Sequence, residues 1–285
     1  MLARHAQQVS LESELVHVGG SVLTAAAQTP LLTTRGLGRS FGRLVALRDL
    51  SVSVSRGEIF GVIGPNGSGK STFFNVVTGF LKADSGGVSF DGAEIAGRPA
   101  TEIVRLGIAR TFQGTRLFRA MTVRDNLLAA AALRTPTAWW DGLLGTPRLK
   151  DAEAAANART DELLHLINLT NRADSAAGDL PYGDQRRLEL ARALATRPKL
   201  LMLDEPAAGM DTGETKALLG LIDDVRKREG LTVIVVEHDM DLIMTLCDRV
   251  HVLAQGQTVF EGTPKDVQAN ARVREVYLGA EDEAA

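Results

Sequence analysis

Apolar and polar positions alternate in the first patterned part of the chain, residues 31–55. Val52 and Val54, for example, alternate with serines. A period of two is typical of strands that bury one face. Residues 86–95 show the same alternation on both sides of an Asp-Gly pair at 91–92, and this pair is a short-range hairpin signal. The pattern predicts an antiparallel β lobe near the start of the chain.

Three later segments are apolar without interruption: residues 58–63, 200–203 and 232–236. Such runs are typical of strands that are buried on both faces of a parallel sheet. Residues 71–77 and 214–228 have helical spacing, and Gly230 ends the second helix, which predicts β-α-β order. Residues 249–254 and 258–261 predict a closing hairpin.

An Ala- and Leu-rich stretch with helical spacing, about residues 122–196, lies in the middle of the chain. A Pro, Trp and Gly segment at 136–147 interrupts it and predicts a loop within a helical insert. Trp139 and Trp140 in that loop could cover a partner surface or anchor local packing. Residues 1–30 contain no compact signal-peptide core, and we expect a flexible N-terminal extension.

Composition narrows the class of protein. The 285 residues carry 32 basic and 35 acidic side chains, a formal net charge of −3, so no nucleic-acid partner is expected. No apolar run is long enough to span a bilayer, and the single Cys247 cannot form an internal disulfide, which makes the cytoplasm the default. No internal repeat is found, so one nucleotide-binding unit is expected.

A glycine-rich segment between the first apolar run and its helix matches G-x-x-x-x-G-K-[ST], and it sits in the strand–helix context that this motif requires. Its residues are Gly64, Pro65, Asn66, Gly67, Ser68, Gly69, Lys70, Ser71 and Thr72. Glycines let successive N–H groups face phosphate oxygens at a helix N-terminus. Lys70 would contact the β and γ phosphates of ATP, and the Ser71 hydroxyl would bind Mg²⁺. The alternative is a mere flexible turn.

Polar residues follow the other two apolar runs. Asp204 and Glu205 come after residues 200–203; Asp204 can hold Mg²⁺ through water, and Glu205 can deprotonate the attacking water. His238 lies just beyond residues 232–236. In open parallel sheets ligands bind beyond the carboxyl ends of strands, so His238 is expected to donate to a γ-phosphate. Alone, such residues would more often be a solvated turn or a structural histidine.

Residues 180–194 resemble the signature segment of ATP-binding-cassette (ABC) ATPases, and all these motifs occur in the order and at the separations usual in that family. The resemblance implies an α/β fold: a P-loop NTPase ABC cassette with a RecA-like parallel-sheet core, an antiparallel β lobe and a helical subdomain. It implies an ATPase domain at 31–279, a helical subdomain at about 114–196 and a C-terminal tail at 280–285.

In this family two cassettes pair head to tail, and the signature of one faces the ATP of the other. The resemblance assigns that role to Pro181, Tyr182, Gly183, Asp184 and Gln185. The segment departs from the common L-S-G-G-Q, because proline replaces serine and offers neither a hydroxyl nor an N–H. A non-hydrolysing regulatory cassette is therefore an alternative. The intact phosphate loop, acidic pair and histidine argue against it.

Four further positions match family positions individually. Gln113 resembles the Q-loop glutamine, which contacts Mg²⁺ or the lytic water and links the site to a membrane subunit. Phe41 resembles the aromatic residue that stacks on adenine, although an ordinary apolar strand residue is the alternative. Asp211 resembles the D-loop aspartate that communicates across the dimer, and Thr72 would lie on the α-phosphate side.

Details of sequence suggest a branch of the family. Segments at 110–113, 116–119, 204–210, 237–240 and 277–279 resemble the branched-chain amino acid importer ATPases, more the LivG type than the LivF type. Cassettes for amide or urea uptake and for lipopolysaccharide export share several of them and stay as alternatives.

The resemblance implies ATP and Mg²⁺ as cofactors. The implied partners are a second cassette, transmembrane permease subunits and, indirectly, a periplasmic or extracellular substrate-binding protein, with the chain at the cytoplasmic face of the membrane. A soluble cassette for DNA maintenance or translation is a weaker alternative. The first class has a long coiled coil between the phosphate loop and the acidic pair, and the second has two cassettes; this chain shows neither feature.

Overall fold

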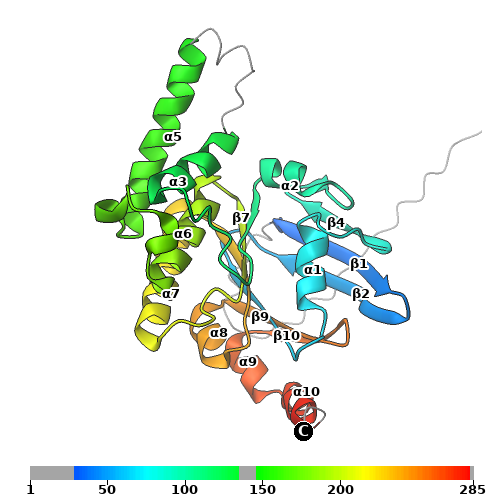
Figure 1. Ribbon diagram of the computed structural model, residues 1–285. Helices are drawn as coiled ribbons and strands as arrows, with labels where there is room; N and C mark the ends of the chain where they lie inside the picture. The colour runs from blue at the N-terminus through cyan, green and yellow to red at the C-terminus, as the bar shows by residue number, and fades with distance from the viewer. Residues whose placement is uncertain (1–28, 135–145, 283–285) are drawn as a thin grey trace, which may run out of the picture.

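The computed structural model describes residues 29–134 and 146–282, which form two sheets with helices around them (Figure 1). The smaller sheet is antiparallel and has the strand order β2-β1-β4-β5. Its strands are β1 (Leu32–Phe41), β2 (Leu44–Val54), β4 (Ser85–Phe90) and β5 (Ala93–Glu94). The predicted β lobe and the hairpin at 86–95 are thus confirmed.

The larger sheet has the order β10-β9-β3-β8-β7-β6, and every neighbouring pair except β10 and β9 is parallel. Its strands are β3 (Ile59–Ile63), β6 (Ile108–Arg110), β7 (Leu200–Asp204), β8 (Thr232–Val236), β9 (Arg249–Ala254) and β10 (Gln257–Gly262). The three uninterrupted apolar runs are therefore the adjacent interior strands β3, β8 and β7, which confirms the prediction of buried strands in a parallel sheet.

These central strands are buried on both faces because two different layers cover the sheet. In β7, Leu201 and Leu203 belong to a core shared with the middle and C-terminal helices. Leu200 and Met202 point the other way, into a core shared with the β lobe and α1. A strand in this position needs apolar side chains at every residue, which is why its sequence shows no alternation.

Helices complete both layers, with α3, α5 and α6 on the opposite side of the molecule from β1 and β2 (Figure 1). The helices are α1 (Lys70–Val77), α2 (Ala100–Leu106), α3 (Val123–Ala131), α5 (Pro147–Leu166), α6 (Tyr182–Ala195), α7 (Thr212–Glu229), α8 (Met240–Leu246), α9 (Pro264–Ala269) and α10 (Ala271–Asp282). Short 3-10 turns are η1 (Ala132–Arg134), η2 (Thr170–Arg172) and η3 (Ala177–Asp179). In α7, Gly230 caps the C-terminus in the left-handed conformation, as predicted.

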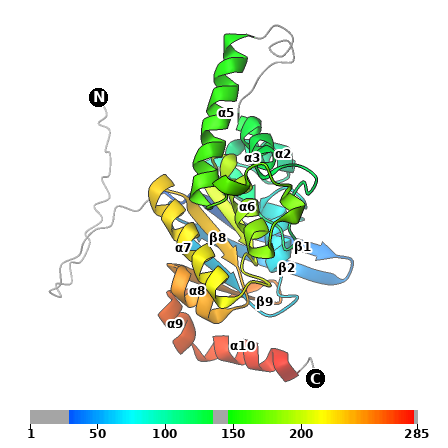
Figure 2. The same cartoon turned by 60° about the vertical axis from the view of Figure 1, so that its left-hand side comes forward.

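Several elements differ from the sequence-based expectations. The patterns did not predict α2, β6, α8, α9 or α10, and α10 extends into the segment expected to be a tail. Figure 2 shows α9 and α10 beyond α8 at the edge of the molecule. The loop at 136–147, with Trp139 and Trp140, falls largely outside the described residues, as does the extension expected at 1–30. Among the described helices, none has the length and apolarity to cross a membrane.

Strand register brings the predicted site residues to one edge of the sheet. Val236 at the end of β8 is opposite Val62 of β3 on one side and Asp204 of β7 on the other. On the far side of β7, Arg110 at the end of β6 is opposite Met202. Because the four strands are parallel, the segments that leave their carboxyl ends emerge side by side.

Candidate functional site

The phosphate loop joins β3 to α1 and is closely enclosed by backbone. Gly64, Gly67 and Gly69 all have positive φ values, of 153°, 77° and 108°. A Cβ at Gly64 would lie 2.0 Å from the Leu253 carbonyl oxygen, and one at Gly69 would lie 2.5 Å from the Ala46 carbonyl oxygen. Only glycine fits at these two positions, since both the conformation and the space exclude a side chain.

Lys70 points back over this loop. Its Nζ donates hydrogen bonds to the Gly64 carbonyl at 2.6 Å and the Pro65 carbonyl at 3.0 Å. Burial lowers the pKa of Lys70, while the nearby carboxylates of Glu205 and Asp204 act to raise it. The ammonium group is therefore held between the loop and the acidic pair, where a phosphate group could bridge to it.

Glu205 lies at the centre of the predicted catalytic residues. Its φ of 47° is in the left-handed region, and its N–H donates to the Val236 carbonyl at 2.9 Å. Gln113 Nε2 donates to Glu205 Oε2 at 3.0 Å, and His238 Nδ1 lies 3.9 Å from Glu205 Oε1. The structure thus brings together the three residues that were expected to be catalytic, on segments that follow β6, β7 and β8.

Asp204 is already paired, with Arg110 on the neighbouring strand. The Arg110 Nη2 to Asp204 Oδ2 distance is 2.8 Å, and both side chains are buried. Arg110 Nη1 also donates to Asn75 Oδ1 at 2.6 Å and contacts the Thr78 hydroxyl at 3.3 Å, and its guanidinium lies 5.0 Å from the ring centre of Phe112. The sequence analysis gave Arg110 no role; a cation at the end of a strand beside the acidic pair was the available signal.

Glu237 is a second residue that the analysis of motifs missed. Its side chain is 2% exposed and accepts a hydrogen bond from the Ala207 N–H at 3.1 Å. Burial raises the pKa of Glu237, against the lowering effect of the Ala207 N–H. An acidic residue directly after a fully apolar strand was the signal that could have found it. Glu237 fixes the backbone that follows Glu205.

The donor set suits a nucleotide phosphate with Mg²⁺. In the phosphate loop the Ser68 hydroxyl is buried and has no hydrogen-bond partner, and glycines line a cradle that side chains would fill. Residues 29–134 and 146–282 contain no group of three or more His, Cys, Asp or Glu side chains that could hold a metal alone. The predicted ligands Ser71, Gln113 and Asp204 are few and all oxygen donors, as Mg²⁺ uses when phosphates complete its coordination.

Phe41 ends β1, and its side chain is 44% exposed. The Arg39 guanidinium lies 4.9 Å from the centre of its ring. The β1–β2 hairpin, which bears Phe41, reaches the phosphate loop, because the Ala46 carbonyl of β2 lies close to Gly69. Stacking of Phe41 on adenine stays a prediction that this exposed position permits.

The signature segment lies at the start of α6 and makes its hydrogen bonds locally. Pro181 is the N-cap and, as expected, supplies no side-chain cap. Tyr182 donates to the Ala208 carbonyl at 2.9 Å, Gln185 Nε2 donates to the Leu180 carbonyl at 2.8 Å, and Asp184 pairs with Arg187 of the next turn. Gly183 is buried. Its described contacts farther along the chain are with Ala208, Gly209 and Glu214, and none is with the phosphate loop of the same chain.

Asp211 has a structural function that the sequence analysis did not predict. It is the N-cap of α7, where its Oδ1 accepts from the Glu214 N–H at 2.8 Å. Glu214 reciprocates, because its Oε2 accepts from the Asp211 N–H at 3.2 Å. This capping box satisfies N–H groups that a helix start otherwise leaves without partners.

Two family models match the chain. The model described as ABC transporter matches residues 47–208, which include the phosphate loop, the signature and Asp204 with Glu205. The model described as branched-chain amino acid ATP-binding cassette transporter matches residues 257–283, which include β10, α9 and α10.

Curated relatives match almost the whole described chain. The high-affinity branched-chain amino acid transport ATP-binding protein LivG of Salmonella typhimurium is 44% identical, over 88% of this chain and 98% of the relative. BraF of Pseudomonas aeruginosa, with the same description, is 43% identical over the same shares. A probable LivG of Archaeoglobus fulgidus is 38% identical, over 88% of this chain and 96% of the relative.

Solved structures agree in fold. A nucleotide-free ATP-binding cassette from an ABC transporter superposes with a TM-score of 0.75, at 33% identity, over 87% of this chain and 98% of that one. The ADP conformation of an ATP-binding cassette of an ABC transporter gives a TM-score of 0.76, at 34% identity, over 88% and 99%. The predicted cassette fold is confirmed.

Proposed function

Since this chain belongs to the ABC transporter family, as one of its ATP-binding subunits, we propose that it hydrolyses ATP to drive the import of branched-chain amino acids through a membrane permease. The observation that carries the proposal is the meeting of Gln113, Glu205 and His238 at the edge of the sheet that also bears the phosphate loop. The matched relatives are branched-chain amino acid transport proteins, and the match covers nearly their full length.

The phosphate loop and Lys70 would bind the triphosphate. Backbone N–H groups of residues 64–72 and the N-terminus of α1 provide a positive surface for it. Lys70 can exchange its bonds with the Gly64 and Pro65 carbonyls for bonds to phosphate oxygens. Phe41 would stack on the adenine, and Thr72 would lie on the α-phosphate side.

Glu205 is the proposed general base. Gln113 fixes one oxygen of its carboxylate at 3.0 Å, which leaves the other oxygen to accept a proton from the attacking water. His238, mostly exposed and 3.9 Å from that other oxygen, would donate a hydrogen bond to the γ-phosphate. Asp204, Ser71 and Gln113 would hold Mg²⁺, which supplies charge neutralisation on the phosphates.

A second cassette would complete the site. Pro181, Tyr182, Gly183, Asp184 and Gln185 make their described contacts with the chain's own residues 180–214, so any contact of this segment with nucleotide is proposed to involve the ATP of a partner. The head-to-tail arrangement is carried over from the family. Asp211 would communicate across that interface in addition to capping α7.

We further propose that the chain associates with permease subunits at the cytoplasmic face of the membrane, and acts indirectly with a periplasmic or extracellular substrate-binding protein. The helical subdomain at about 114–196, within a cassette at 31–279, would transmit motion to the permease. Amide or urea uptake and lipopolysaccharide export are not favoured, because the named relatives serve branched-chain amino acid transport.

Uptake of radiolabelled leucine, isoleucine and valine tests this function. In cells without another uptake system for these amino acids, deletion of the chain should abolish uptake of all three. The wild-type chain should restore it, whereas the matched variant Lys70→Met should not. Unchanged uptake after deletion would contradict the substrate class, and loss of amide or urea uptake instead would favour that alternative.

A further inference from the structure

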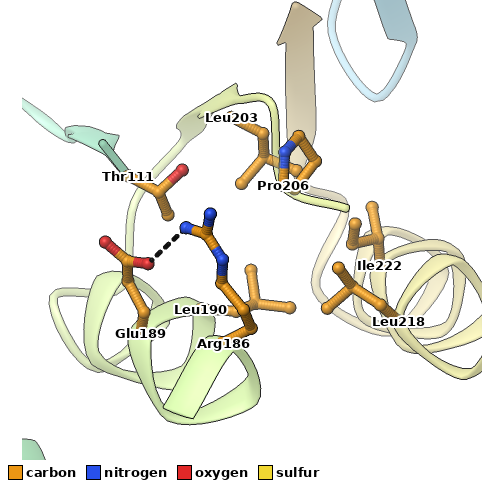
Figure 3. Close-up of a pocket in the computed structure, with 8 residues that line it drawn as sticks. All are labelled: Thr111, Arg186, Glu189, Leu190, Leu203, Pro206, Leu218 and Ile222. Atoms are coloured by element: carbon orange, nitrogen blue, oxygen red, sulfur yellow. Dashed lines mark hydrogen bonds and ion pairs between the residues drawn. The ribbon is translucent and has the colours of Figure 1, made fainter. Parts of the chain in front are cut away.

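A buried ion pair on α6 lies behind the catalytic residues. Arg186 Nη1 is 3.1 Å from Glu189 Oε2, and each side chain is only 4% exposed. Figure 3 shows this pair at a small cavity between α6, the segment after β6 and α7, with Thr111, Leu203 and Leu218 among the residues that line it. Burying two charges is costly unless their remaining hydrogen-bonding groups are used, so the other partners of Arg186 are informative.

Two of those partners are carbonyls of the loop that carries Gln113. Arg186 Nη1 lies 3.4 Å from the Phe112 carbonyl oxygen, and Nη2 lies 3.3 Å from the Gln113 carbonyl oxygen. Gln113 is itself exposed, and its side chain contacts Glu205. The guanidinium therefore holds the backbone of the residue whose amide fixes the proposed base.

The Nε donor of Arg186 connects the guanidinium, through Tyr182, to the segment that follows Glu205. Nε donates to the Tyr182 hydroxyl at 3.0 Å, and that hydroxyl donates to the Ala208 carbonyl at 2.9 Å. The ring also covers Gly209, where an added Cβ would be 3.3 Å from Tyr182 Cε1. Tyr182 stands where the common signature has a glycine, which has no side chain to make these contacts.

We propose that Arg186 is a positioning residue that fastens the Gln113 loop to the signature helix, and that Tyr182 extends this fastening to Ala208. α6, Gln113 and the segment after Glu205 then move as one unit. Only arginine suits the position, because its planar fork reaches four acceptors at once, whereas a lysine ammonium is a single point. The proposal rests on the proposed function, in which Gln113 serves hydrolysis.

Arg186→Lys tests the fastening, because it keeps a positive charge beside Glu189 and removes the fork. The loss of charge-assisted hydrogen bonds, about 1.5 kcal/mol or more, corresponds to about tenfold. We expect amide hydrogen exchange of residues 112–116 to quicken about tenfold, and kcat for ATP to fall while its KM changes less than about twofold. The matched control is Arg187→Lys on the same helix, since Arg187 bonds to Asp184 and the Ile167 carbonyl instead.

Hydrogen exchange tests the fastening of the Gln113 loop, and kcat tests the proposed function of Gln113 in hydrolysis. Unchanged exchange at 112–116 in Arg186→Lys, or the same acceleration in Arg187→Lys, overturns the fastening. Faster exchange with unaltered kcat supports the fastening and removes Gln113 from the proposed chemistry.

Tyr182→Phe tests the second connection. It keeps the Arg186–Glu189 ion pair and removes only the hydroxyl that accepts from Arg186 Nε and donates to the Ala208 carbonyl. It should quicken exchange at residues 207–210 and leave that at 112–116 near the wild-type rate. Exchange at 207–210 equal to wild type overturns the connection through Tyr182, even if Arg186→Lys does not fold.

Discussion

Arg110 and Asp204 form a buried ion pair across two parallel strands, with 2.8 Å between Nη2 and Oδ2. One carboxylate oxygen of the proposed metal ligand is thereby fixed, and the other stays available. The same arginine reaches Asn75 on α1, the helix that follows the phosphate loop. The two halves of the nucleotide site are connected by this one side chain.

Arg110→Gln should destabilise the fold markedly, because it leaves the Asp204 carboxylate buried without its partner. We expect a loss of about 3 to 5 kcal/mol in the free energy of unfolding, measured by urea titration. Arg39→Gln is the control, since its pair with Asp84 is partly exposed, at 24% and 47% of the two side chains, and should cost about 1 kcal/mol or less. Equal small losses in both variants would contradict a structural role for the Arg110 pair.

Glu205→Gln should retain ATP binding and lose most turnover, because an amide cannot accept the proton of the attacking water. A general base typically contributes about 100-fold or more to the rate. Steady-state ATPase assays of the assembled transporter, with ATP binding measured in parallel, give the two quantities. The control is Glu102→Gln, because the Glu102 side chain on α2 is exposed; this variant should behave as wild type. An undiminished rate in Glu205→Gln would show that Glu205 is not the base.

Lys70→Met should abolish stabilisation of the protein by ATP. A ligand at about 100 times its dissociation constant adds about 2.7 kcal/mol to the free energy of unfolding, and the wild type should show a gain of this order in urea titrations with ATP. Lys82→Met, at an exposed position, should retain the gain. If Lys70→Met were stabilised as much as wild type, the phosphate loop would not be the ATP site.

The backbone of the phosphate loop could be predicted from the sequence because it depends on local rules. Glycines, a strand before them and a helix after them define the phosphate loop, and the carboxyl ends of apolar strands predicted where Glu205 and His238 would meet. Arg110 and Glu237 gave weaker signals, each a charged residue at the end of a strand. Their partners, Asp204 at the end of β7 and Ala207 in the segment after it, are brought to them by the register of β6, β7 and β8.

The missed elements have similar causes. β6 has three residues, too few for a periodic signal, and α9 has six. Asp211 resembled a family position, and that resemblance concealed its simpler function as a helix cap. The contacts of Tyr182 depend on a loop that approaches from a distant part of the chain.

Glu237→Gln should change how stability depends on pH. Burial raises the pKa of Glu237, so the folded state binds this proton more tightly than the unfolded state does. The contribution of Glu237 to the free energy of unfolding therefore falls as pH rises above its unfolded pKa, about 4.3. Glutamine does not titrate, so the variant's stability relative to wild type should increase from pH 4 to pH 7.

Urea titrations of both proteins at several pH values measure that difference. Any constant cost of the substitution cancels in the slope, as does the titration of Glu189, which both proteins contain. A difference that is independent of pH would contradict the raised pKa.

Asp211→Ala should cost about 1 kcal/mol of stability by removing the N-cap of α7. Asp211→Asn keeps an oxygen that can accept from the Glu214 N–H and should cost much less. Thermal or urea unfolding of the isolated cassette measures both. If Asp211→Asn nevertheless impairs ATPase activity of the assembled transporter, the carboxylate acts beyond capping; equal destabilisation by both substitutions would contradict the cap.

The residues that enclose the phosphate loop come from early and late parts of the chain. Leu253 in β9 closes over Gly64, and Gly256 donates its N–H to the Ser68 carbonyl at 2.9 Å while its own carbonyl accepts from Arg48. Synthesis proceeds from the N-terminus, so a chain still on the ribosome has made its glycine motif long before it has made this wall. We therefore expect the loop to reach the shape that holds a nucleotide only once the last hairpin has been made.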